Sequence, residues 1–204
     1  MPRIVAMADT HNRHAGLAVP DGDVLIHAGD LTGRGSLPEL DQVAEWLRSL
    51  PHPHKVVVAG NHDFALQRNP VAARALFHGL TFLEDSEATL AGLRIWGSPW
   101  QPWFHDWAFN LRRGGEIDAK WRLIPEGVDV LITHGPPLGF GDLVDRGEKV
   151  GCEDLLRHLE RVKPRLHLFG HIHEDRGEWQ YGPSRLVNCT TSEGELPVTV
   201  LDLP

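Results

Sequence analysis

Five short apolar runs, spread along the chain, constrain its fold more than any other feature. They cover residues 3–8, 24–28, 55–59, 130–133 and 166–169. Runs this short and this free of polar residues are typical of strands that are buried on both faces of a sheet. Because helical patterns separate several of the runs, we predict an α/β fold built from strand–helix units.

Three segments carry the helical pattern. In residues 37–50 apolar side chains recur at intervals of three and four residues, and Ser36 before Pro38 is a typical helix start. Residues 69–78 and 153–162 are the other predicted helices.

The remaining apolar segments are shorter and resemble the strands of antiparallel hairpins. We predict strands at residues 81–83, 88–90, 93–96, 178–181, 185–188 and 198–201. The sequence has no internal repeat and no linker-like stretch, so we expect one domain over residues 1–204.

Composition and charge exclude several classes of protein. No stretch approaches the roughly 20 apolar residues of a membrane span. The first residues lack the long apolar core of a signal peptide, so we expect a cytoplasmic protein without a membrane partner. The net charge of −8 argues against binding to a nucleic-acid polymer. The two cysteines, Cys152 and Cys189, are expected to be free thiols.

Residues that commonly bind metals follow each of the five apolar runs. The carboxyl ends of strands are where α/β proteins gather ligands and catalytic groups. We therefore expect these side chains to share one site. They are Asp9 and His11, Asp30, Asn61 with His62 and Asp63, His134, and finally His171 with His173.

Glycines next to these residues allow the backbone to approach an ion or a substrate closely. They are Gly29, Gly60, Gly135 and Gly170. The spacing of His171 and His173 suggests an extended chain, in which both imidazoles face one site while Ile172 points into the core.

The expected ligand set mixes nitrogen and oxygen donors and contains no cysteine. Such a set favours Mn, Fe, Zn or Co over Mg or Ca alone. One carboxylate can bridge two cations, and two cations about 3.5–4 Å apart can clamp the oxygens of a phosphoryl group. Each motif taken alone has an ordinary explanation, because Gly-Asp usually marks a turn and Asp-x-His is common. It is improbable that all five motifs would follow predicted strands by chance.

In this order the motifs resemble the signature of the calcineurin-like metallophosphoesterases, and in particular their metallophosphoesterase-domain-containing branch. The ligand motifs are highly specific, and the resemblance extends over nearly the whole chain. Further matching segments are residues 85–87, 100–104, 124–127, 133–139, 151–152 and 170–174.

The resemblance implies a four-layer αββα sandwich and a site for two divalent transition metals. A first metal position would take Asp9, His11, Asp30 and His173, and a second would take Asp30, Asn61, His134 and His171. Asp30 would bridge the two, as would the water or hydroxide that attacks phosphorus. His62 matches the histidine that contacts the phosphate and protonates the leaving oxygen, and Asp63 is expected to support His62.

Two departures from relatives refine this expectation. The protein Ser/Thr phosphatases carry Gly-Asp-x-x-Asp-Arg-Gly, whereas residues 29–35 lack the second Asp, which weakens a protein-phosphatase assignment. Some members of the similar branch lack the histidine that corresponds to His171 and are poor catalysts. His171 is present here, so we expect both metal positions to be complete.

An aromatic segment at residues 100–107 is the remaining candidate for substrate binding. Its Trp and Phe residues, Trp103 among them, either wall a pocket or pin a loop to the body of the protein. His105 in the same segment could reach a substrate.

The preferred hypothesis is a Mn-dependent phosphodiesterase for small phosphoesters such as cyclic nucleotides. A phosphomonoesterase of broad specificity is the alternative enzyme, and a metal-binding scaffold with vestigial activity is the alternative outside enzymes. A nuclease fits less well, given the net charge. The sequence leaves the oligomeric state open.

Overall fold

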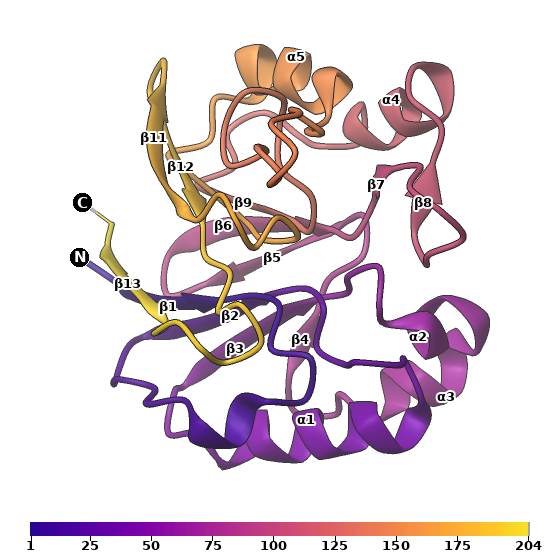
Figure 1. The fold of residues 1–204 in the computed structure, drawn as a ribbon. Helices are drawn as coiled ribbons and strands as arrows, with labels where there is room; N and C mark the ends of the chain where they lie inside the picture. The colour runs from indigo at the N-terminus through magenta and orange to yellow at the C-terminus, as the bar shows by residue number, and fades with distance from the viewer. Residues whose placement is uncertain (204) are drawn as a thin grey trace.

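The structure is a computed structural model that describes residues 1–203. Two β-sheets lie face to face, and helices cover their outer sides (Figure 1). The predicted αββα sandwich is therefore confirmed. The first sheet has the strand order β13-β1-β2-β3-β4. Its strands are β1 (Arg3–Met7), β2 (Val24–Ala28), β3 (His54–Val58), β4 (Thr81–Phe82) and β13 (Thr199–Asp202).

The second sheet has six strands in the order β11-β12-β10-β9-β6-β5. They are β5 (Ser86–Leu90), β6 (Leu93–Ser98), β9 (Val130–Thr133), β10 (Leu166–Phe169), β11 (Gly177–Tyr181) and β12 (Ser184–Asn188). A small parallel ribbon of β7 (Gln101–Pro102) and β8 (Asn110–Leu111) lies beside the two sheets.

The helices form the two outer layers (Figure 1). The first sheet is covered by α1 (Leu37–Ser49), α2 (Phe64–Arg68) and α3 (Pro70–Ala75), with the short 3-10 helix η1 (His14–Gly16) beside α1. The second sheet is covered by α4 (Gly115–Trp121) and α5 (Glu153–Val162). Within the described residues, none of these helices is long and apolar enough to cross a membrane.

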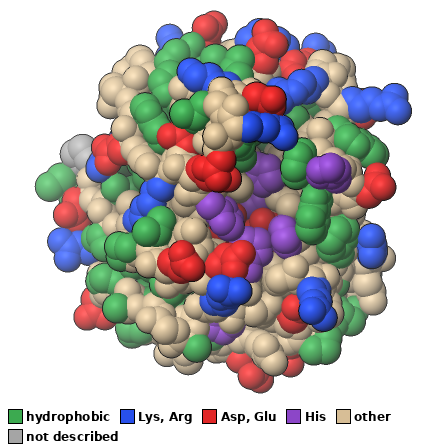
Figure 2. All heavy atoms as spheres, viewed as in Figure 1, with side chains coloured by type: hydrophobic (Ala, Val, Ile, Leu, Met, Phe, Trp, Pro, Cys, Tyr) green, Lys and Arg blue, Asp and Glu red, His purple; other side chains and the backbone are tan. Residues whose placement is uncertain are grey.

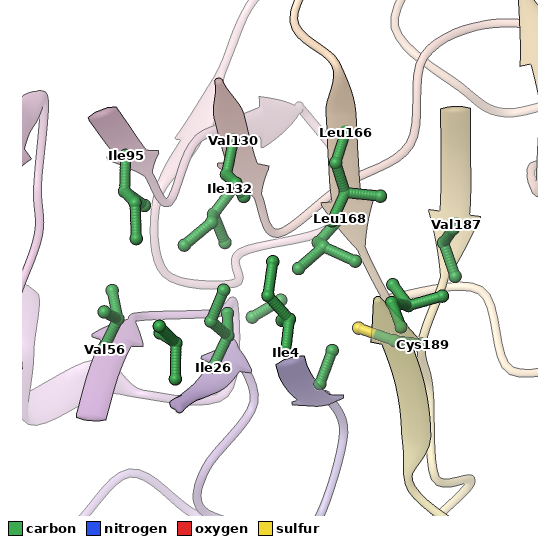
Figure 3. Close-up of a cluster of buried hydrophobic side chains, with 14 of the residues drawn as sticks. Ile4, Ile26, Val56, Ile95, Val130, Ile132, Leu166, Leu168, Val187 and Cys189 are labelled. Carbon is green, nitrogen blue, oxygen red and sulfur yellow. The ribbon is translucent and has the colours of Figure 1, made fainter. Parts of the chain in front are cut away.

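The main core lies between the two sheets. Ile4, Ile26 and Val56 point up from the first sheet toward Ile132 and Leu168 of the second (Figure 3). All five are fully or almost fully buried. Each such side chain contributes about 1.5–3 kcal/mol through removal of apolar surface from water. This layer therefore fixes the positions of the strand ends that carry the polar residues.

Strand direction brings those ends together. The strands β1, β2 and β3 run parallel, as do β6, β9, β10 and β12. A parallel bridge between Ala8 and Thr190 joins the end of β1 to the segment after β12. The carboxyl ends of both sets of strands consequently open onto one edge of the sandwich.

The predicted elements agree with the structure where their sequence signals were strong. All five apolar runs are strands, with boundaries that differ by at most one residue. Ser36 caps the start of helix α1: its side chain accepts a hydrogen bond from the Glu39 N–H, while Glu39 accepts a bond from the Ser36 N–H. Helix α5 has the predicted bounds.

Three predictions of local structure were incomplete. The helix predicted at residues 69–78 ends at Ala75, and the separate helix α2 precedes it. Helix α4 was not predicted. The short strands at residues 81–96 divide between the sheets, because β4 pairs in parallel with β3 whereas β5 and β6 form the expected hairpin.

Candidate metal centre

The predicted ligand residues meet at the edge of the sandwich where the parallel strands end. Histidine side chains gather at the centre of this face, with carboxylates between them (Figure 2). Three overlapping groups place their ligand atoms within 4.8 Å of one another. The groups are Asp9, His11 and His173; His11, Asp30 and His62; and Asp30, His134 and His171.

Asp30 lies between two of the imidazoles. Its Oδ2 is 3.7 Å from Nε2 of His11 and 3.4 Å from Nε2 of His134. Its Oδ1 accepts a hydrogen bond of 2.8 Å from the backbone N–H of His62. The side chain is 4% exposed, so this carboxylate is buried among nitrogen donors.

The separations fit bound ions. Two ligands that each lie about 2.0–2.2 Å from one ion are roughly 3–3.5 Å apart when the angle between them is near 100°. The Asp30–His134 distance falls in this range, and the distances of 3.7 Å for His11–Asp30 and 3.9 Å for Asp9–His173 lie slightly above it. The residues present therefore suit divalent cations that take nitrogen and oxygen ligands.

Backbone carbonyls orient the imidazoles. Nδ1 of His11 lies 3.2 Å from the Thr32 carbonyl oxygen, and Nδ1 of His134 lies 3.0 Å from that of Ala28. When Nδ1 donates its proton to a carbonyl, Nε2 is left with a lone pair that faces the site. This arrangement prepares each ring to bind a cation.

A second contact of His134 supports the same interpretation. Its Nε2 lies 2.9 Å from Oδ1 of Asn61, and that atom is also an acceptor. Two acceptors at this distance repel unless a cation or a proton lies between them. The His134 side chain is fully buried, and Asn61 is 4% exposed, so water cannot easily relieve the repulsion.

Burial and the Asp30 carboxylate act in opposite directions on the pKa values of the imidazoles. Burial lowers the pKa of His171 to about 3 and also lowers the pKa of His11. Burial acts in the same direction on His134, but the adjacent Asp30 carboxylate outweighs it and raises the pKa of His134 to about 9. The protein therefore attracts positive charge to the point between Asp30 and His134.

The backbone around the site adopts an uncommon conformation. Asp9, His11, Asp30 and His171 all have positive φ, at 55°, 43°, 54° and 70°. Non-glycine residues with such φ values cluster at functional sites and cost of order 1–3 kcal/mol each. Here the left-handed turns re-aim side chains directly after the strands end.

The turn at His171 corrects the extended arrangement that we predicted for His171 and His173. Both histidines do enter the site, but His171 joins the group of Asp30 and His134, whereas His173 joins Asp9 and His11. The φ of 70° at His171 separates them. The expected burial of Ile172 is confirmed, at 5% exposure.

Three of the predicted close approaches of glycine to side chains of the site are present, and at Gly29 an added Cβ would lie 2.4 Å from Nδ1 of His134. A Cβ on Gly60 would lie 2.3 Å from Oδ1 of Asp30, and one on Gly170 would lie 2.4 Å from Oδ2 of Asp9. A side chain at Gly60 or Gly170 would displace a carboxylate of the site.

His62 is held on three sides. Its Nδ1 lies 2.9 Å from the Gly33 carbonyl oxygen, and the ring of His11 meets it edge-on at 4.5 Å between centroids. Trp107 stacks on the ring at 4.2 Å and an interplanar angle of 26°. The N–H of Ala108 donates to the Asn61 carbonyl, which ties the Trp107 loop to the turn that carries His62. The sequence placed Trp107 in the aromatic segment, but it gave no sign of this contact with His62, which lies 45 positions away.

Asp63 has a different role from the one expected. Its carboxylate accepts hydrogen bonds from the backbone N–H groups of Gly60, Leu31 and Thr32 and from the Thr32 hydroxyl, at 2.8–3.3 Å. The prediction that Asp63 supports the His62 ring is therefore wrong, because the Gly33 carbonyl orients that ring. Asp63 instead joins the loop after β2 to the loop after β3.

The aromatic segment divides into a structural part and an exposed part. The indole N–H of Trp100 donates to Asp85, which also accepts from Ser98 and Lys120. By contrast, Trp103 is 57% and Phe104 46% exposed. Both line a pocket that also borders His171. His105 packs on Phe104 at 4.4 Å between centroids but is not among the described residues that line this pocket.

Comparisons with known proteins agree with this geometry. The family model described as calcineurin-like phosphoesterase matches residues 2–175. Metallophosphoesterase domain-containing protein 1 of Homo sapiens is 45% identical over 231 residues, which covers 99% of this chain and 71% of the human protein.

Two further similarities are more distant. A probable cyclic nucleotide phosphodiesterase of Synechococcus is 28% identical over 159 residues, covering 74% of this chain and 58% of that protein. The crystal structure of TT1561 from Thermus thermophilus superposes with a TM-score of 0.66 at 14% identity, covering 100% of this chain and 99% of that one. The family match, the human relative and the shared fold together place the chain in the family of calcineurin-like metallophosphoesterases.

Proposed function

We propose that the protein is a phosphodiesterase that depends on two divalent transition metals and hydrolyses small phosphodiesters, with cyclic nucleotides as candidate substrates. The observation that carries the proposal is the position of Asp30, whose Oδ2 lies between the Nε2 atoms of His11 and His134. A carboxylate so placed can be shared by two cations. The family supports hydrolysis of phosphoesters in general, and the Synechococcus relative supports the narrower class.

The two metal positions use the residues that the sequence predicted. Asp9, His11, Asp30 and His173 would hold the first cation, and Asp30, Asn61, His134 and His171 would hold the second. We favour Mn, with Fe, Zn and Co as alternatives, because the donors are nitrogen and oxygen without thiolate. When bound, the pair of cations polarises the phosphoryl oxygens and activates the attacking water.

His62 completes the proposed chemistry. Its Nδ1 contacts the Gly33 carbonyl, so Nε2 is free to face the substrate. In hydrolysis the oxygen of water loses a proton to solvent and forms a bond to phosphorus, the bond from phosphorus to the leaving oxygen breaks, and the leaving oxygen takes a proton. We assign the donation of this proton to Nε2 of His62. The stacked Trp107 and the edge of His11 hold the ring in place for the transfer.

A diester suits the site better than a monoester on two grounds. A monoester dianion binds cations more tightly in the ground state, and such binding does not by itself accelerate the reaction. The exposed apolar faces of Trp103 and Phe104 also offer a surface for a second ester group. His105 is a candidate for contact with the same group, from its place beside Phe104.

The test compares kcat/KM for an aryl phosphodiester with that for the matching aryl monoester, at one pH and with Mn as the metal. We expect the diester to react faster. A tenfold preference for the monoester would establish the phosphomonoesterase alternative instead, and no turnover of either ester would favour a metal-binding scaffold.

Metal content provides an independent test. Elemental analysis after reloading with Mn should approach two equivalents per chain, and Asp30→Asn should reduce this value. Asp21→Asn is a matched control, because Asp21 is exposed and outside the site. One equivalent or fewer in the parent protein, unaffected by Asp30→Asn, would rule out the shared carboxylate.

A further inference from the structure

A pocket of about 570 Å³ opens beside the candidate metal centre. Trp103 and Phe104 form its aromatic wall, Val144 and Val150 also line it, and His171 of the metal centre borders it. This volume lies within the range of roughly 300–1,000 Å³ that is usual for sites of small organic molecules. It exceeds what a phosphate group alone requires.

Hydrogen bonds fix the aromatic wall. The N–H of Trp103 donates to the Leu111 carbonyl at 2.9 Å. The side-chain amide of Asn110 donates to the carbonyls of Phe104 and His105 at 3.0 and 2.9 Å. The aromatic side chains are therefore exposed on a backbone that is already ordered, which lowers the entropic cost of binding.

The segment that carries Val144 and Val150 is fixed in the same way. Asp142 is 1% exposed and accepts hydrogen bonds from the N–H groups of Gly139 and Gly151 at 2.8 and 3.1 Å. The N–H of Val150 donates to the Asp142 carbonyl at 3.0 Å, and that of Val144 donates to the Glu148 carbonyl at 3.0 Å. The pocket is thus formed before a ligand binds.

The charged groups around the pocket do not favour an anion. Arg113 donates to the carbonyls of Gly151 and Val150, both at 2.7 Å, and Arg146 is paired with Glu148 at 2.7 Å. The lining also includes two carboxylates, those of Asp145 and Glu174. A second phosphate or another anionic group would meet one cation without an ion pair, Arg113, whose terminal nitrogens already donate to carbonyls, and would face two carboxylates. The pocket therefore favours an uncharged occupant.

The position of His62 indicates which part of a substrate enters the pocket. Nitrogen atoms of His62 and His11 belong to one ligand group with Asp30, whereas the pocket borders His171 of the other group. The leaving oxygen must lie within reach of the proton donor. The pocket, on the His171 side, is then available to the ester group that stays on phosphorus.

We propose that this pocket is a subsite for the retained ester group of the substrate, and that it selects one flat, uncharged aromatic group such as a nucleobase. The assignment rests on the proposed phosphodiesterase function. Stacking on Trp103 and Phe104 supplies the affinity, since an aromatic face accepts any base. Substrates that carry a second phosphate on this group are disfavoured.

The test holds the leaving group constant and varies only the retained group. It compares the thymidyl ester and the methyl ester of p-nitrophenyl phosphate with Mn-loaded protein. We expect kcat/KM to be roughly tenfold or more higher for the thymidyl ester, the size expected for one base stacked on an aromatic ring. Adding a phosphate to the free hydroxyl of the thymidyl group should remove most of this advantage.

Variants locate the preference. Trp103→Ala should bring the thymidyl-to-methyl ratio close to one, whereas Val71→Ala, which removes an exposed apolar side chain on α3, should leave it unchanged. Equal kcat/KM for the two esters in the parent protein would overturn the subsite while leaving the phosphodiesterase function intact. A ratio that Trp103→Ala does not alter would also overturn it.

A binding measurement separates failure of the subsite from failure of the proposed function. If neither diester is hydrolysed but p-nitrophenyl phosphate is, the diesterase function fails. Calorimetry with adenosine monophosphate and ribose phosphate then tests the pocket without turnover. Tighter binding of adenosine monophosphate by roughly tenfold, lost in Trp103→Ala, supports the subsite, and equal affinity overturns it.

Discussion

Replacement of Asp63 by Asn tests the role that the structure gives to this buried carboxylate. The side chain is fully buried, and each of its oxygens accepts two hydrogen bonds. An Asn keeps one acceptor oxygen and presents an NH₂ group to the other pair of donors. Two hydrogen bonds to a charged acceptor are therefore lost, and donors face donors.

The expected cost follows from those two bonds. Hydrogen bonds to charged groups contribute about 1.5–3 kcal/mol each, so Asp63→Asn should lower the free energy of unfolding by roughly 3–6 kcal/mol. That is a large part of the roughly 5–15 kcal/mol that is typical of a folded domain. For a chain of this size, the melting temperature should fall by on the order of 10 °C.

The assay is thermal and urea unfolding of the metal-free protein, followed by titration with Mn. Burial and the nearby Asp30 raise the pKa of Asp63 to about 6, so a buffer near pH ~8 keeps the parent carboxylate ionised. Asp41→Asn, on the exposed face of α1, is the matched control. Metal affinity should also weaken, because the two loops that Asp63 joins carry Asp30 and Asn61.

One result would refute this reasoning. If Asp63→Asn unfolds like the parent protein and binds Mn normally, yet loses kcat, then Asp63 acts on the chemistry of His62 and the assignment to loop structure is wrong.

Three other substitutions give separate checks. His62→Gln should retain both metals but lose about 10²–10⁴-fold in rate, less for good leaving groups, as measured by metal analysis and kcat. Trp107→Leu should lower kcat roughly two- to tenfold with little change in KM, since aromatic stacking is worth about 0.5–1.5 kcal/mol. Trp46→Leu, which removes a similar contact with His14, should leave kcat unchanged. Burial lowers the pKa of His167 to about 3. Below pH ~6.5 the unfolded chain therefore takes up a proton that the folded chain excludes, and the free energy of unfolding decreases as the pH decreases. When measured by urea unfolding, the free energy of unfolding of His167→Phe should decrease between about pH 7.5 and pH 5 by about 2 kcal/mol less than that of the parent protein.

The helices and strands that were predicted correctly have local sequence patterns that identify them without knowledge of tertiary contacts. An unbroken apolar run such as that of β9 has few alternatives to a buried strand. The Ser36–Glu39 capping box similarly marks the start of α1. Helix α4 was missed because it has seven residues and buries only Ile117 and Trp121, too few for a helical period to be recognised.

The candidate site also has features that the sequence predicted and features that it did not. The identities of the ligand residues followed from their positions directly after strands. The directions of side chains did not, because they depend on left-handed turns such as the one at His171, where an extended chain was the simpler expectation. Trp107 stacks on His62 although the two residues are distant in the sequence. Asp63 forms its hydrogen bonds with the loop after β2 and not with the neighbouring His62 ring. Contacts of this kind can be recognised only when the loops are packed together in the folded protein.

The conformations at the site explain why so rigid a framework surrounds it. Asp9, Asp30 and His171 each occupy a left-handed backbone position that a free chain avoids, at a cost of order 1–3 kcal/mol per residue. Hydrogen bonds from the framework hold two of these turns, since the N–H of Asp9 donates to the Gly29 carbonyl and the N–H of His171 donates to the Asp9 carboxylate. The apolar layer between the sheets supplies the stability that offsets the strain. Because these bonds are made by the protein alone, its fold directs the carboxylates and imidazoles toward one another before any cation binds.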